Sequence, residues 1–384
     1  MIRSTVARVD LDALRGNFVA IQRYLSSERD RTPPAIIAVV KANAYGHGSA
    51  RVALALEEAG ATMLACADIE EGVVLRQAGV RVPILVFGAL SVSRLDGLVE
   101  FDLTPTISTP GAARAVQAAA ARYQATIAYH LKIDTGMNRL GFRHDNLRRT
   151  LPELLASRNL RLDAVYTHFA SADVPDSDVF AEQRLTFEEA LETVTGLGGQ
   201  PRLRHASNSA ALLRDSRVWY DAVRPGLLLY GIVPPPLAST IELTPVMSLT
   251  SRVVAVKGLR PGEGVGYGLR YQAQEPRSVA VVPAGYADGL DTRLSGRGHV
   301  LIRGRRVPIV GAVSMDMLTV DVTTLDQVQP GDEVVILGRQ GDESWQRIDA
   351  REMAAAIGTI PWEIICRLGT RIERYYDSTP GSQT

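Results

Sequence analysis

The sequence has few cysteines and no excess of either charge. Only Cys66 and Cys366 occur among 384 residues, which is too few for a disulfide framework and fits a reducing compartment. The 42 Lys and Arg residues balance 42 Asp and Glu residues, so the formal net charge is zero. Proteins that bind polyanions without sequence specificity carry an excess of Lys and Arg. We therefore expect no nucleic-acid partner.

Long apolar runs are also absent. The longest ones, such as AIIAVV at 35–40, fall far short of the roughly 18 residues that span a bilayer. The first residues, MIRSTVARVDLDALRGNF, carry charges throughout and lack the apolar core of a secretory signal peptide. The chain is thus predicted to be soluble, cytoplasmic and without a membrane partner, and its length predicts about two or three domains.

Short apolar runs alternate with helical patterns over the first two-thirds of the chain. Helical segments such as 49–60, 113–123 and 179–194 are rich in Ala, Leu, Glu and Arg, and Gly60 and Gly79 end two helices as C′ residues do. Repeated β-then-α units favour parallel strands that are buried on both faces. Eight strands favour a closed (β/α)8 barrel of the TIM type over an open sheet. The expected strands are 35–42, 62–67, 83–88, 103–108, 127–134, 162–169, 202–207 and 221–226.

The pattern changes after PPPLA at 234–238. Pro and Gly become frequent, helical periodicity nearly vanishes, and short apolar segments are bounded by turns, which predicts a mainly β domain. The barrel domain is therefore placed at 1–237 and the β domain at 238–384. The opening strand, at about 3–11, is expected to pair with the β domain.

Two local signals lie near the C-terminus. DAREMAAAIG at 349–358 predicts the single helix of the β domain, because Asp349 offers a side-chain oxygen to the first turn. The last residues, DSTPGSQT at 377–384, are small and polar and predict a disordered tail.

Polar residues gather where the expected barrel strands end, which is where active sites of parallel α/β barrels lie. Lys41 follows the apolar run AIIAVV. Partial desolvation there would lower its pKa and favour Schiff-base chemistry, although a lysine that reaches solvent is the alternative. The other polar residues near strand ends are Lys132, Asp134, Arg139, His168, Ser207, Asn208, Ser209 and Arg224.

The segment SNSAALL at 207–213 suits a phosphate group. It follows the seventh expected strand and opens a helix, where N–H groups and hydroxyls bind anions. Ser209 could both cap the helix and bind, or it could only cap. Gly226, next to Leu227, follows the eighth strand, and barrel phosphate sites often use these two loops. Nucleotide-binding glycine motifs and metal-ligand motifs are absent, so we expect no nucleotide and no metal.

Eight motifs together suggest a family. The segment VKANAYGHG at 40–48 is followed by LKIDTGMNRLG (131–141), THFASAD (167–173), HASNSAALL (205–213), VRPGLLLYG (223–231), GYGLRY (266–271), AGYADG (284–289) and VGAVSMDMLTVDVT (310–323). In order and spacing they resemble the motifs of alanine racemases, which are pyridoxal-phosphate-dependent isomerases with a barrel and a β domain. The resemblance covers nearly the whole chain.

The resemblance implies how pyridoxal 5'-phosphate is bound. Lys41 would hold it as an internal aldimine, and Tyr45 would contact its phosphate. Arg224 would face the pyridine nitrogen and donate a hydrogen bond without protonating it, which makes the ring a weaker electron sink and suppresses side reactions. From the residues alone, a structural ion pair is the alternative for Arg224. The cofactor residues implied are Lys41, Tyr45, His168, Asn208, Ser209, Arg224, Gly226 and Leu227.

Racemisation needs a base on each face of Cα. The resemblance gives these roles to Lys41 and to Tyr267 of GYGLRY, with Tyr267 and Met315 contributed by the partner in a head-to-tail homodimer. A phenol with a pKa of about 10 must have that pKa lowered to act as a base at neutral pH. The expected reaction is interconversion of L- and D-alanine through an external aldimine, which supplies D-alanine for peptidoglycan.

The remaining roles concern the substrate. Arg139 is expected to bind its carboxylate through the planar guanidinium, and Met315 is expected beside it. In many relatives the equivalent of Lys132 is carbamylated and orients the arginine, and we expect the same here. Asp316 would support the site, and Tyr286 would narrow the substrate entrance.

Other functions stay open at this point. A serine or broad-specificity racemase is the closest, because GYADGLDTRL lacks the usual Pro-Arg, and Thr370 lies near the position of a phosphate-contacting tyrosine of some relatives. A fold-related pyridoxal-phosphate decarboxylase would carry a catalytic-cysteine motif that Cys366 does not match. A non-catalytic cofactor-binding protein of the single-barrel type would lack the β domain.

Overall fold

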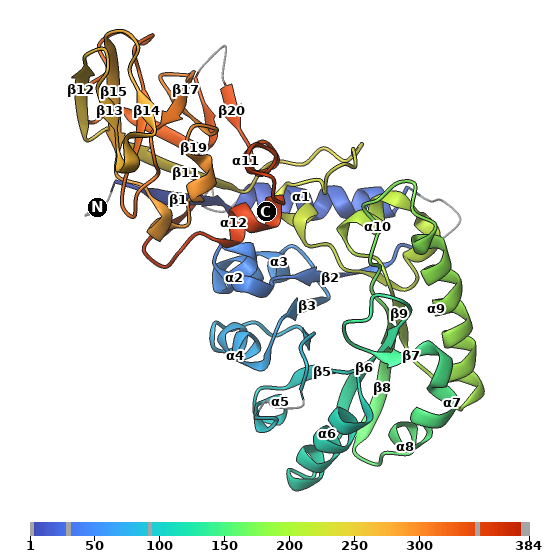
Figure 1. The fold of residues 1–384 in the computed structure, drawn as a ribbon. Coiled ribbons are helices and arrows are strands. Elements are labelled where there is room, and N and C mark those ends of the chain that lie inside the picture. The colour runs from blue at the N-terminus through green and yellow to red at the C-terminus, as the bar shows by residue number, and fades with distance from the viewer. Residues whose placement is uncertain (1–3, 28–31, 91–93, 342–345, 378–384) are drawn as a thin grey trace. The chain divides into compact units, whose positions relative to one another are not determined.

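The computed structural model describes residues 4–27, 32–90, 94–341 and 346–377. They form two compact units, each assembled from separate stretches of the chain (Figure 1). The barrel unit comprises residues 14–44 and 49–243, and the β unit comprises residues 1–13, 45–48 and 244–384 as far as they are described. The tail expected to be disordered lies, beyond Asp377, outside the described residues. Within the described ranges, no helix combines the length and apolar character needed to cross a membrane.

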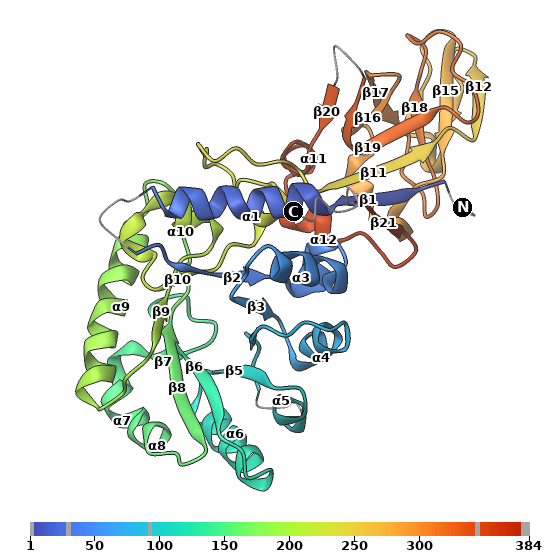
Figure 2. The ribbon, with the colours of Figure 1, turned by 180° about the vertical axis from the view of Figure 1, so that it is seen from behind.

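Eight parallel strands close into a ring in the barrel unit, with helices outside them (Figures 1 and 2). Pairing of β5 with β6 and of β10 with β2 completes the ring, so the predicted (β/α)8 barrel is confirmed. Apolar side chains dominate the strands because both faces are covered. The ring strands are β2 (Ala35–Val39), β3 (Met63–Cys66), β4 (Ile84–Val86), β5 (Leu103–Ile107), β6 (Ile127–Asp134), β8 (Leu160–Tyr166), β9 (Leu203–His205) and β10 (Ala222–Val223), and β7 (Phe142–Arg143) pairs with β6.

Several helices of the barrel unit begin at N-cap residues and end at glycines that favour helix termination. The Asp68 side chain accepts from the Glu71 N–H at the start of α4, and Thr109 caps α6 ahead of Pro110. Gly79, just after α4, has the left-handed φ of +100° expected of a C′ residue. The helices are α1 (Leu11–Leu25, begun in the β unit), α2 (Lys41–Tyr45), α3 (Ser49–Glu58), α4 (Ile69–Gln77), α5 (Asp96–Glu100), α6 (Pro110–Arg122), α7 (Leu147–Thr150), α8 (Pro152–Leu155), α9 (Val179–Gly196) and α10 (Ser209–Arg214).

The β unit is built on one large, mostly antiparallel sheet. Its order is β12-β15-β18-β17-β16-β19-β11-β1-β21, with β20 paired to β19 and a separate β13–β14 hairpin. The first strand of the chain lies between β11 and β21. The strands are β1 (Val6–Asp10), β11 (Met247–Arg252), β12 (Ala255–Leu259), β13 (Gly264–Val265), β14 (Tyr271–Gln272), β15 (Arg277–Val282), β16 (His299–Ile302), β17 (Arg305–Val310), β18 (Leu318–Asp321), β19 (Glu333–Gln340), β20 (Gln346–Ile348) and β21 (Glu373–Asp377).

Two features of the β unit differ from what the sequence predicted. Besides the expected α11 (Ala350–Ile357), a second helix, α12 (Pro361–Cys366), is present. It is short and apolar enough to pass for a strand, although Pro361 occupies the first helical turn. In addition, residues 45–48 pack in the β unit: Arg374 Nε donates to the Gly46 carbonyl over 2.6 Å. A Cβ at Gly46, whose φ is +81°, would collide with the Ile365 carbonyl oxygen.

The N-cap of α11 gives a test of the local stability of the β unit. Asp349 Oδ1 accepts from the Glu352 N–H over 2.9 Å, and Oδ2 accepts from Arg347 Nη2 over 3.0 Å. Asp349→Ala should destabilise the unit by about 1 kcal/mol because the cap is lost, which thermal unfolding followed by circular dichroism will detect. Asp349→Asn is the control, since Asn caps equally well but cannot form the ion pair. An equal loss in both variants would assign the effect to Arg347 instead.

Candidate active site

Lys41 begins a strained turn at the carboxyl end of β2. The next four residues, Ala42 to Tyr45, all have φ of 52–53°. For residues other than glycine, a left-handed helical turn costs roughly 1–2 kcal/mol per residue. This conformation therefore needs contacts from neighbouring elements.

A carboxylate on the neighbouring helix supplies one such contact. Glu71 Oε1 accepts from the Ala42 N–H over 2.7 Å, and its Oε2 accepts from the Ala67 N–H over 2.8 Å. On the other side of the turn, Asn43 Oδ1 accepts from the Ser49 N–H over 2.8 Å, at the start of α3. Glu71 is not among the residues predicted from the sequence, although Asp68-x-x-Glu71 is the pattern of a helix start. The backbone next to Lys41 is thus held by β3, α3 and α4.

Arg224 follows β10 and is 3% exposed. Its Nη1 donates to His205 Nδ1 over 2.7 Å. Its Nη2 donates to the carbonyl oxygens of Thr167 and Ala206 over 2.9 and 2.8 Å, and to His168 Nδ1 over 3.2 Å. These acceptors are all neutral, so the structural ion pair considered from the sequence is not how this arginine is held. Burial lowers the pKa of Arg224 to about 10, which leaves the guanidinium charged at neutral pH.

The two histidines beside Arg224 are neutral. Desolvation, followed by the charge of Arg224, lowers the pKa of His168 and of His205 well below the usual value. An arginine can only donate, so the Nδ1 atom that faces it in each ring carries no proton. His205 also stacks on the Tyr166 ring, with centroids 4.7 Å apart. The arginine therefore sits in a rigid, polar cluster inside the barrel.

Lys132 lies on β6 and is 6% exposed. Burial lowers its pKa to about 8, and the charges of Arg139, Arg224 and Lys41 act in the same direction, against Asp134. Its Nζ lies 5.7 Å from the centroid of the Tyr166 ring. The barrel thus brings four of the predicted cations together, and such a cluster favours anionic ligands.

The loops after β9 and β10 are joined by hydrogen bonds. Asn208, and not Ser209, caps α10: its Oδ1 accepts from the Ala211 N–H over 2.9 Å. Ser209 Oγ instead accepts from the Gly226 N–H over 2.9 Å. The sequence pointed to Ser209 as the cap because serines, which also cap helices, lie on both sides of Asn208. Together with Leu227, these residues present short polar side chains and backbone amides, which is the donor set that suits a phosphate.

The remaining predicted residues lie on loops of the β unit. Tyr267 is 79% exposed, and Met315 and Tyr286 are about half exposed. The Tyr286 N–H donates to the Ser314 carbonyl over 3.0 Å, which joins two of these loops. Asp316 pairs with Arg371 over 2.7 Å. Tyr45, buried, also belongs to the β unit.

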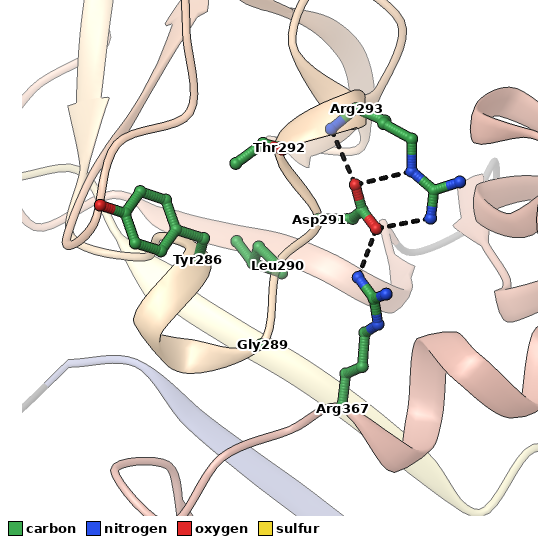
Figure 3. Close-up of a pocket in the computed structure, with 7 residues that line it drawn as sticks. All are labelled: Tyr286, Gly289, Leu290, Asp291, Thr292, Arg293 and Arg367. Carbon is green, nitrogen blue, oxygen red and sulfur yellow. Dashed lines mark hydrogen bonds and ion pairs between the residues drawn. The ribbon is translucent and has the colours of Figure 1, made fainter.

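Tyr286 also borders a pocket of about 600 Å³ in the β unit (Figure 3). Arg293 and Arg367 line it, and their guanidinium groups converge on the carboxylate of Asp291, which both bind (Figure 3). Arg293 and, more weakly, Arg367 lower the pKa of Asp291 to about 2. Glu363 also pairs with both arginines, so two carboxylates balance the two positive charges within the protein, and the pocket has little net attraction for an anion.

Comparison with known proteins agrees with the motifs. Residues 9–234 match the family "Alanine racemase, N-terminal domain", and residues 246–376 match "Alanine racemase, C-terminal domain". Alanine racemases of Halothermothrix orenii and Sorangium cellulosum are 40% and 42% identical to the chain over 380 residues, which covers 98–99% of each sequence. Among solved structures, alanine racemase from Streptomyces lavendulae has a TM-score of 0.92 at 34% identity, covering 99% of this chain and 98% of its own. Alanine racemase from Bacillus anthracis with bound L-Ala-P has a TM-score of 0.89 at 36% identity, covering 99% and 97%.

Removal of the Glu71 carboxylate tests whether it holds the turn after Lys41. Glu71→Ala leaves the N–H groups of Ala42 and Ala67 without this acceptor, and a lost hydrogen bond of this kind costs roughly 1–3 kcal/mol. We expect faster amide hydrogen exchange over residues 42–45, together with a lower melting temperature. Glu70→Ala is the matched control, because Glu70 is exposed on the same turn of α4. Equal exchange in the two variants would show that Glu71 does not hold the turn.

Proposed function

Because this chain belongs to the alanine racemase family of pyridoxal-phosphate-dependent isomerases, we propose that it interconverts L- and D-alanine. The observation that carries the proposal is the cationic cluster of Lys41, Lys132, Arg139 and Arg224 at the carboxyl ends of the barrel strands. It matches a cofactor with a phosphate and an amino acid with a carboxylate. Cytoplasmic location and supply of D-alanine to peptidoglycan are part of the same proposal.

The residues of the chain fit the cofactor. Lys41 supplies the amine, and the joined loops around Asn208, Ser209 and Gly226 supply the donors for the phosphate, with Tyr45 as a further contact. Pyridoxal phosphate, when bound, withdraws electrons from the amino acid and so acidifies its Cα–H bond. Arg224, backed by His168, would donate to the ring nitrogen and keep its own proton. The withdrawal of electrons then stays moderate, which favours return of the proton to Cα over side reactions.

Two groups must exchange protons with Cα from opposite faces. We assign one face to Lys41 Nζ and the other to Tyr267 Oη: one takes the proton, and the other delivers its own. A group that exchanges protons in the rate-determining step contributes typically about 10²–10⁴-fold to the rate. Arg139 would hold the substrate carboxylate through its guanidinium, with Met315 beside the substrate.

Exposed apolar side chains on the β unit support a second copy of the chain as partner. Tyr267, Leu269, Tyr286, Met315 and Met317 are each 45–79% exposed. They lie on loops of one unit, and two of these loops are hydrogen-bonded to each other through the backbone. Apolar groups gathered in this way usually mark an interaction surface. In a head-to-tail homodimer, this surface would bring Tyr267 and Met315 to the Lys41 of the partner.

Carbamylation of Lys132 would relieve an unfavourable concentration of charge. A buried ammonium lies among Lys41, Arg139 and Arg224, and with a pKa of about 8 a fraction of the amine is neutral at physiological pH. The neutral amine can attack CO2, which forms an N–C bond and releases one proton. The product is an anion that can accept hydrogen bonds from Arg139.

Replacement of Tyr267 tests the two-base assignment. Tyr267→Phe should lower kcat for alanine racemisation by about 10²-fold or more and leave the visible absorbance of the bound cofactor unchanged. Tyr271→Phe is the matched control: this hydroxyl, in the same motif, donates to Asp321 over 3.2 Å and has no assigned role in the reaction. Full activity of Tyr267→Phe would refute the assignment.

Assays with serine and larger amino acids decide substrate breadth, and equal rates with serine would favour the broad-specificity alternative.

Carbon-13 NMR tests the state of Lys132. In buffer with ¹³C-bicarbonate, the wild type should show a carbamate signal that is absent from Lys132→Met. A free amine makes a different prediction: its pKa is about 8 folded and 10.5 unfolded, so the unfolded state binds more protons between these values. Stability relative to Lys132→Met would then rise as the pH rises from about 8 to 10.5. For the carbamate, the same rise should already be present below pH 8, because the unfolded lysine, which loses the carbamate, takes up a proton there as well.

A further inference from the structure

Four buried polar side chains form a line across neighbouring strands of the barrel. Arg224 Nη1 lies 2.7 Å from His205 Nδ1, and His205 Nε2 lies 3.0 Å from His130 Nδ1. His130 Nε2 lies 3.8 Å from Asp163 Oδ2. The four residues are at most 4% exposed, and they come from β6, β8, β9 and the end of β10, which are consecutive in the ring.

The direction of every hydrogen bond in this line follows from the arginine. Arg224 can only donate, so His205 Nδ1 has no proton and the neutral ring carries its proton on Nε2. That proton is donated to His130 Nδ1. Desolvation lowers the pKa of His130 as well, so its single proton lies on Nε2 and faces Asp163. Within the described residues, this Nε2 is one of three buried side-chain atoms without a hydrogen-bond partner, which leaves the carboxylate as the group that attracts it.

Asp163 is suited to fix this direction because it is ionised. Its interaction with His130, and then its bonds to Arg202 and Arg161, lower its pKa far below the usual value. Arg202 Nη2 donates to Oδ2 over 2.9 Å, and Arg161 Nη1 donates to Oδ1 over 3.0 Å. The side chains of both arginines are at least 60% exposed, whereas the carboxylate is 6% exposed. An ionised carboxylate accepts hydrogen bonds but has no proton to donate.

We propose that Asp163 is a positioning residue for the reaction, and that it holds the Arg224 guanidinium in place through His130 and His205. The proposal deepens the proposed function, on which it rests. The carboxylate keeps the His130 proton on Nε2, His130 keeps the His205 proton on Nε2, and His205 therefore presents a bare Nδ1 to Arg224. An anion at the far end of the line, Asp163, thus sets which atom accepts the hydrogen bond of the buried Arg224 cation.

Asp163→Asn should reverse the line without changing its shape. The amide oxygen would be retained by Arg161 and by Arg202 Nε, both of which donate to Oδ1 in the wild type. The NH2 group would then replace Oδ2 and donate to His130 Nε2, while Arg202 Nη2, which donates to Oδ2 in the wild type, would turn to solvent. His130 would move its proton to Nδ1, His205 would follow, and two donors would face each other at Arg224. An unsatisfied buried donor of this kind is costly, so the guanidinium should shift.

Histidine NMR measures the outcome directly. The chain has only six histidines, so ¹⁵N-histidine labelling of the holoenzyme resolves the imidazole nitrogens. The wild type should show His130 and His205 protonated on Nε2, and Asp163→Asn should show both protonated on Nδ1. We also expect kcat for alanine to fall roughly tenfold or more, as is typical when a supporting partner is lost, with a smaller change in KM.

The control removes the ion pairs and keeps the carboxylate. Arg161→Gln/Arg202→Gln should retain the wild-type tautomers and kcat. Loss of kcat in this variant to the level of Asp163→Asn would overturn the proposal, as would unchanged tautomers in Asp163→Asn. Wild-type His205 protonated on Nδ1 would overturn it even if no variant folded. Tautomers are read without substrate, so a wild type that does not racemise alanine would refute the proposed function and leave this test intact.

Discussion

Burial of the positive charge of Arg224 is the constraint on which the inside of the barrel depends. A charged group removed from water must be fully hydrogen-bonded, or it loses far more free energy than packing restores. The barrel meets this demand with backbone carbonyls and neutral imidazoles. These acceptors come from the ends of two other strands, so the arginine also fixes the register of the loops around it. Because these acceptors are neutral, the guanidinium keeps its positive charge, which in the proposed function would face the ring nitrogen of the cofactor.

Arg224 and Lys41 are held in place by different physical means. Around Arg224 the groups are rigid because they are buried and mutually hydrogen-bonded. Around Lys41 the backbone is held in an unfavourable conformation by Glu71 and Asn43, which places the lysine by strain and countervailing contacts. The proposed phenol, that of Tyr267, is highly exposed on a loop of the β unit, where contacts with a partner surface would complete its placement.

Much of the architecture could be predicted from the sequence, because buried parallel strands appear as unbroken apolar runs and the turns between them carry Gly, Asp and Asn. The supporting residues could not. His130 and Asp163 lie within strands and give no local signal, since their roles come from strand pairings that join positions far apart in sequence. Glu71 was hidden as an ordinary helix-start residue. Asn and Ser cap helices about equally well, so the sequence could not decide that Asn208 rather than Ser209 is the cap of α10.

The position of β1 has a consequence for synthesis. This strand is synthesised before the barrel strands, yet its two neighbours are β11, which begins at Met247, and β21, which ends at Asp377. The barrel can therefore close during translation, while β1 keeps unpaired edges until β11 and then β21 have been synthesised. A gene divided near residue 240 would yield a C-terminal fragment with two open sheet edges, prone to aggregation. Co-expression with a peptide carrying the first ten residues would be needed to cover them.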